Sequence, residues 1–291
     1  MAVASPYESR PGTHAPDWGA VTGWDVFFNN LSLGLFVVVA AGMLLRPAWF
    51  SPVAAPAYIL TFLAIGLDLL LLVSDLGDSL RMPHMLRVAK RESAMSVGTW
   101  ALSAFAMLVL ITAALTLSGL QDAARVTAAA GLVPAAFGLL YKGVLFSASS
   151  QPGWRDARWL GALLTVWSLL LGVSLALVLL VLWRQGGGEA AHALRAALIA
   201  LIALTGILLF VVWAEVRLVY RVRFGDEVRT GIWLAVLCIG LILPLLLVLL
   251  GDLLQIVAAL LVIVTAPVAR LALVALPHRP PGDRPGRTGR R

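Results

Sequence analysis

The chain has 291 residues, of which 60% are hydrophobic and 13% charged, with a formal net charge of +7 and a mean hydropathy of +0.93. A soluble domain carries about 25% charged residues, so this composition excludes the soluble class and indicates an integral membrane protein. The single cysteine, Cys238, cannot by itself frame a disulfide, an iron–sulfur cluster or a zinc site.

Eight stretches of the chain have the length and the apolar character of membrane-spanning helices. They run over 25–45, 56–75, 96–119, 124–149, 157–183, 192–220, 231–250 and 252–275. Their Leu, Ala and Val runs do not alternate with polar residues, as the strands of a membrane barrel do. The expected fold class is therefore an all-α integral membrane protein with eight transmembrane helices.

The remaining segments suggest how the chain is organised. Residues 1–24 are polar and contain several prolines, and we expect an irregular tail that ends at the membrane interface. Residues 25–149 and 150–276 are expected to form two four-helix transmembrane bundles, and 277–291 a disordered basic tail. Pro134 and Pro244 fall inside the fourth and seventh spans and are expected to kink them.

The basic residues are distributed unequally between the two faces of the membrane. Most of the basic residues lie on one face, in the N-terminal tail, three of the connections and the C-terminal segment, where Arg270 is counted. The basic residues of the other face are Arg46, Arg125, Arg184 and Arg195. The positive-inside rule then predicts that both termini are cytoplasmic. The membrane itself is expected to be a bacterial plasma membrane. No basic patch is interleaved with aromatic residues, so the charge does not indicate nucleic-acid binding.

Histidines do not support a haem-bearing anchor, because such an anchor needs paired histidines inside its helices. The four histidines lie in the tails, in a connection and at the start of the sixth span, at His14, His84, His192 and His278. We therefore expect neither haem nor metal in this chain, and any redox metal would belong to a partner.

Polar side chains inside spanning helices mark function or buried pairs. Asp68 lies near the middle of the second span, where it either belongs to a proton path or forms a structural hydrogen bond. The alternating directions of the helices place six other polar residues at similar depth near the basic face: Asn29, Asn30, Asp75, Ser96, Tyr141 and Lys142.

This convergence predicts a polar pocket just below one membrane surface. Asp75 can form an ion pair there with Lys142 or with Arg81. A quinone suits such a pocket, since it needs hydrogen-bond donors at its carbonyls, a nearby proton source and apolar walls for its tail. The alternative is that these groups only cap helices, join them or reach the interface.

Residues 75–83 read DLGDSLRMP at the end of the second span, and residues 93–100 read SAMSVGTW at the start of the third. These two motifs resemble the Asp-Leu-Gly-Arg-Pro helix end and the Ser-Pro-Met-Ser-x-Gly-x-Trp helix start of the NrfD/PsrC family of polysulfide reductase membrane anchors. Residues 141–149 (YKGVLFSAS) resemble its Tyr-Thr-Gly segment, with Lys142 in place of the threonine. Residues 24–34 resemble its first helix, and eight similarly spaced helices extend the likeness over most of the chain.

The resemblance implies a membrane subunit of an iron–sulfur oxidoreductase complex, often a molybdoenzyme of anaerobic respiration. Such a subunit binds menaquinone or ubiquinone and exchanges electrons with a ferredoxin-like iron–sulfur subunit, which serves a catalytic subunit. Tyr141 would donate a hydrogen bond to the quinone, Asn29 or Asn30 would hold its other side, and Asp75 would organise the pocket or relay protons. Arg81 and His84 would lie where the partner docks.

Two questions stay open at the level of sequence. Several family members place this functional face outside the cytoplasm, whereas the charge distribution places it inside. The chain could also be a small-molecule transporter, or a structural or assembly protein of the membrane without redox function.

Overall fold

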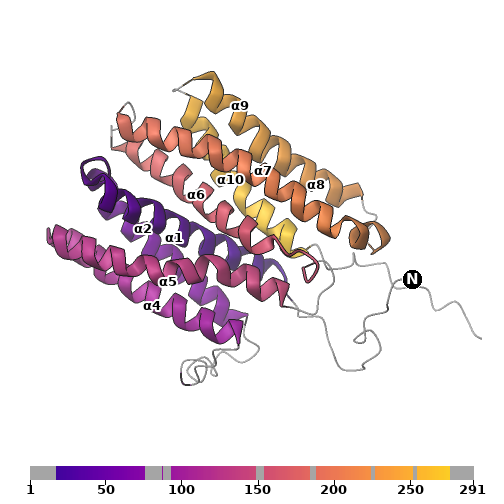
Figure 1. The fold of residues 1–291 in the computed structure, drawn as a ribbon, viewed down its shortest axis with the longest axis horizontal. Helices are drawn as coiled ribbons and strands as arrows, with labels where there is room; N and C mark the ends of the chain where they lie inside the picture. The colour runs from indigo at the N-terminus through magenta and orange to yellow at the C-terminus, as the bar shows by residue number, and fades with distance from the viewer. Residues whose placement is uncertain are drawn as a thin grey trace, which may run out of the picture.

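A computed structural model describes residues 18–75, 87, 93–148, 154–183, 188–223, 227–251 and 254–275, with only the backbone described over 217–223 and 227–231. Nearly all of these residues are helical, and none of them lies in a strand. The helices are α1 (Ala20–Leu45), α2 (Pro47–Ser74), α4 (Ala94–Leu117), α5 (Gln121–Ser147), α6 (Leu160–Leu182), α7 (Glu189–Arg223), α8 (Glu227–Leu237), η2 (Cys238–Ile242), α9 (Leu243–Leu250) and α10 (Gln255–Ala275). Figure 1 shows them side by side with their axes roughly aligned.

Within the described residues, eight helices are long and apolar enough to cross a membrane. Seven of the crossings are single helices, and the seventh in chain order, Ile232–Leu250, combines α8, η2 and α9. The predicted all-α membrane fold with eight spans is therefore confirmed. The two tails at 1–17 and 276–291 lie outside the described residues.

Two predicted helix starts were wrong. Helix α1 begins at Ala20, five residues before the predicted start, and α2 begins at Pro47 rather than at residue 56. The Arg46-Pro47 step had indicated a connection between the first two spans. Proline fits the first turn of a helix, where its missing N–H has no partner in any case, and it is also tolerated inside membrane helices, as at Pro52 and Pro56.

The two internal prolines behave differently. Pro134 lies within the continuous helix α5. Pro244 lies two residues after the end of the π-helical turn η2, in the first turn of α9, so the seventh span departs from regular α-helix next to this proline. A π-turn widens the helix by one residue and is frequent at functional sites.

Helix α1 is central to the packing and contacts α2, α5, α6 and α10 (Figure 1). It approaches α6 closely because Gly34 faces Gly172: a Cβ atom added to Gly34 would lie 1.7 Å from the carbonyl oxygen of Ser168. Small residues at such crossings let helix backbones come together in membranes. Because α1 and α5 contact α6 as well as their own half, the division into two four-helix bundles stays a prediction.

Candidate functional site: a buried charge cluster on α1, α2 and α5

Three charged side chains from three helices meet inside the protein. Lys142 on α5 is 2% exposed, and its Nζ donates a hydrogen bond to Asp25 Oδ2 on α1 and lies 3.5 Å from Asp68 Oδ1 on α2. Asp25 and Asp68 are 3% and 0% exposed. Burial of this degree is tolerated for a charge only when it is paired, and each carboxylate here shares the same cation.

Asn29 completes the cluster and helps to hold it. Its Nδ2 donates to Asp68 Oδ2 at 3.0 Å. Asp25 and Asn29 are four residues apart on α1 and therefore occupy one face of that helix. If all three charged groups are ionised, two carboxylates face one ammonium, so the cluster has one negative charge in excess. One additional proton would neutralise it, which gives the cluster a place to hold a proton.

Several buried polar atoms around Lys142 have no hydrogen-bond partner among the described residues. These atoms are Tyr141 Oη, Asp25 Oδ1 and Asn29 Oδ1. Native proteins rarely leave buried polar atoms unsatisfied, and each such atom points to a water molecule, an ion or a ligand. These atoms could therefore form hydrogen bonds to a bound ligand or water molecule in addition to the contacts within the cluster.

The Tyr141 ring lies on Gly98, which links two of the motifs found in the sequence. A Cβ atom added to Gly98 would lie 2.1 Å from Cδ2 and Cε2 of that ring. Only a glycine leaves this room, so Gly98 fixes the ring of Tyr141 beside Lys142, whose Nζ is 5.4 Å from the ring centroid. Segment 93–100 and the described part of the 141–149 motif thus meet in the fold at Gly98 and Tyr141, as the shared depth predicted.

Asp75 lies at the same end of the bundle but outside the cluster. It is exposed at the end of α2 and accepts a hydrogen bond from Thr22 Oγ1 at 3.1 Å. Among the described residues, Lys142 forms ion pairs with Asp25 and Asp68, so the predicted Asp75–Lys142 pair is wrong. The reason is depth: Lys142 extends into the interior, where Asp68 is available, while Asp75 stays near the surface.

The other predicted residues are only partly brought together. Asn30 is buried, but it faces α10 and accepts a hydrogen bond from Arg270 Nε at 3.2 Å, so it does not join the cluster. The backbone of Ser96 donates to Ser93 Oγ in the N-cap of α4. Arg81 and His84, the predicted docking residues, lie outside the described residues.

Two charged residues of evident importance were missed in the sequence. Asp25 stood at the predicted start of the first span and was not considered, although its spacing from Asn29 signalled a shared helix face. Arg270 was counted among the charges that set the topology, but it is 3% exposed inside the protein. Its position five residues before the end of α10 was the available signal.

No protein-family model matches the sequence, and no curated protein matches it. The resemblance to the NrfD/PsrC anchors therefore rests on the motifs alone and stays a prediction.

Proposed function

We propose that this chain is a quinone-binding membrane subunit of an electron-transfer complex, in which the cluster around Lys142 exchanges protons with the quinone. The observation that carries the proposal is the ammonium of Lys142, buried between two carboxylates beside a Tyr141 hydroxyl that has no partner among the described residues. Ionisable groups at this depth in a membrane protein are expensive and mark function by default.

Different residues of the cluster are proposed to bind the quinone, to hold the proton and to position the carboxylates. Reduction of a quinone to a quinol consumes two electrons and two protons. Tyr141 Oη is available to donate a hydrogen bond to a quinone carbonyl. Asp25 and Asp68 are available to hold the exchanging proton, and Lys142 stabilises whichever carboxylate is ionised. The amide of Asn29 donates to Asp68, so Asn29 is proposed as a positioning residue.

A proton route to the surface is also available in the geometry. Asp75 is exposed and accepts a hydrogen bond from Thr22, which lies three residues before Asp25 on α1 and so on the same helix face. A hydroxyl both donates and accepts, which suits it to pass a proton. Asp75 is accordingly proposed as the entry of a relay through Thr22 to Asp25.

The electrons are proposed to come from, or go to, a ferredoxin-like iron–sulfur subunit that serves a catalytic subunit. Its proposed docking face is the end of the bundle where α1 begins and where α2 and α5 end, because the cluster lies nearest to that end. Assignment of this face to the cytoplasm of a bacterial cell follows from the positive-inside rule and is part of the proposal.

The test is quinone binding by the purified protein in detergent, measured as quenching of tryptophan fluorescence by a menaquinol analogue. Tyr141→Phe removes only the hydroxyl, and loss of one neutral hydrogen bond weakens binding by roughly 2- to 10-fold. Tyr58→Phe is the matched control, because Tyr58 is buried to a similar degree but packs against Phe36 on the α1–α2 interface. Equal affinities for Tyr141→Phe and the unmodified protein would contradict the assigned role of Tyr141.

A second candidate function, a proton-coupled transporter of small molecules, is favoured by the π-helical turn η2 inside the seventh span. Such turns within α-helices are frequent at functional sites. The two candidates separate in proteoliposomes. Proton flux that needs no quinone, together with a lack of saturable quenching in detergent, would favour the transporter.

A further inference from the structure

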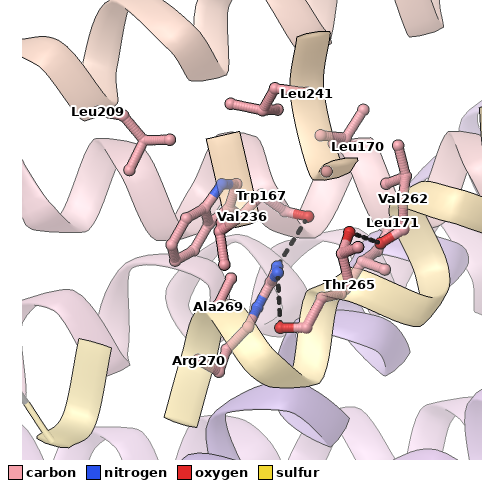
Figure 2. A pocket seen from close by; sticks show the side chains of 12 residues that line it. Trp167, Leu170, Leu171, Leu209, Val236, Leu241, Val262, Thr265, Ala269 and Arg270 are labelled. Atoms are coloured by element: carbon pink, nitrogen blue, oxygen red, sulfur yellow. Dashed lines mark hydrogen bonds between the residues drawn. The ribbon is translucent and has the colours of Figure 1, made fainter. Parts of the chain in front are cut away.

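Arg270 on α10 forms a second buried cationic site, which contacts a different face of α1 from the Lys142 cluster, through Asn30 rather than Asn29. Its guanidinium lies over the Trp167 ring, with Cζ 4.5 Å from the ring centroid. Nε donates to Asn30 Oδ1 at 3.2 Å, and the two Nη atoms donate to the carbonyl oxygens of Ala266 and Trp167, both at 3.3 Å. Figure 2 shows the side chain extended from α10 along Trp167.

All these contacts of Arg270 are with neutral groups. In the part of the chain that the structure describes, the ion pairs include none with Arg270, whereas Lys142 has two carboxylates. A guanidinium carries five N–H groups, and the three hydrogen bonds leave two of them available. A buried cation without a counter-charge is costly, so this site is suited to an anion.

A small cavity adjoins the guanidinium. It has a volume of about 20 Å³ and is lined by Arg270 together with Trp167, Thr265, Leu241 and Gly240 (Figure 2). A space of this size holds about one water-sized group. It is large enough for one oxygen of a carboxylate and too small for a bulky head group.

An apolar groove of about 450 Å³ lies next to this cavity, between α7 and the seventh span. Its lining residues are aliphatic or aromatic apart from one glycine, and they include Ile202, Gly206, Phe210, Leu237 and Leu245. Leu241, in the π-turn η2, lines both the groove and the cavity. The side chain of Leu241 therefore stands between the apolar groove and the cavity beside Arg270.

We propose that the cavity and the adjacent groove together bind a long-chain fatty acid, whose chain passes the side chain of Leu241. One carboxylate oxygen enters the cavity and accepts hydrogen bonds from the two available N–H groups of Arg270, and the alkyl chain lies in the groove. The charge of the head supplies the missing counter-charge, and the single chain suits a narrow apolar groove. The site lies between α6, α7, η2 and α10, apart from the Lys142 cluster, and does not depend on quinone binding.

The experiment uses the full chain in detergent and titrates it with cis-parinaric acid, whose fluorescence is excited by energy transfer from tryptophan. Trp167 lines the cavity, so a bound probe gives a saturable signal. The methyl ester of the same acid lacks the charge and is expected to bind at least about tenfold more weakly, since a hydrogen bond to a charged group contributes about 1.5–3 kcal/mol. Arg270→Gln should abolish this difference between acid and ester.

A groove-filling variant tests the chain of the ligand without touching Arg270. A Cβ atom added at Gly206 meets no atom within 4 Å, and Gly206 lines the groove, so the side chain in Gly206→Leu has room at its base and occupies groove space. It is expected to weaken binding of the acid by tenfold or more. Gly66→Leu is the matched control, because Gly66 on α2 is equally free of neighbours and lies outside the groove. Equal binding of acid and ester, or binding unchanged in Gly206→Leu, would overturn the proposal.

Discussion

Lys142→Met is expected to lower the free energy of unfolding by about 3–5 kcal/mol, the usual loss when one partner of a buried ion pair is removed. Methionine keeps most of the length of the side chain, so the change removes the charge and leaves Asp25 and Asp68 buried without a cation. The measurement is the thermal unfolding midpoint in detergent, followed by circular dichroism.

Two further variants separate the lost charge from lost packing. The triple variant Lys142→Met, Asp25→Asn, Asp68→Asn removes all three charges and should recover most of the lost stability. Arg125→Met breaks an ion pair with Asp122 that is solvent-exposed, and it should leave the midpoint almost unchanged. The electrostatic explanation fails if Lys142→Met unfolds at the temperature of the unmodified protein.

Gly34→Ala is the second substitution with a large expected effect, because it separates α1 from α6. The new methyl group would lie 1.7 Å from the carbonyl oxygen of Ser168 and 2.5 Å from the carbonyl carbon. Both atoms belong to the backbone, so no side-chain rotation relieves the contact. We expect a loss at or above the upper end of the roughly 1–3 kcal/mol that overpacking costs, with a lower yield of folded protein.

Gly66→Ala makes the same chemical change on α2, where a Cβ atom meets nothing within 4 Å. Its unfolding midpoint should equal or slightly exceed that of the unmodified protein, since alanine is favoured over glycine in a helix. Size-exclusion profiles in detergent and unfolding midpoints of both variants make the comparison. Equal behaviour of the two would show that α1 and α6 are not in close contact at Gly34.

The sequence predicted the existence of the helices well, because a long run of apolar residues is enough to identify a membrane-spanning helix. All eight spans exist in the described residues, because a run of about 20 apolar residues has few stable alternatives in a membrane. It failed at the start of α2, where Arg46-Pro47 indicated a connection and the predicted span began only at residue 56. Lipid offers no hydrogen-bond partners to a loop, so the helix is preferred despite the prolines.

The candidate site was predicted at the correct end of the bundle but not in its pairs. Helix parity correctly brought Lys142 and Tyr141 towards the start of α1. It could not show that Lys142 reaches Asp68 rather than Asp75, because the two carboxylates lie about two helical turns apart on one face of α2, and parity does not fix depth to within two turns. The rotation of α1 about its own axis directs Asn29 to the Lys142 cluster and Asn30 to Arg270, although the two residues are adjacent in the chain.

The sequence by itself determined that this protein is a helical membrane protein with eight spans, because the transfer of apolar side chains into lipid depends on composition and length alone. The tertiary structure decided which charges are paired. Asp25 and Asp68 share Lys142, whereas Arg270 meets only neutral groups in the described residues. Such pairing depends on how closely helices approach and how they are rotated, and at α1 and α6 the approach is set by the contact of Gly34 with the Ser168 backbone.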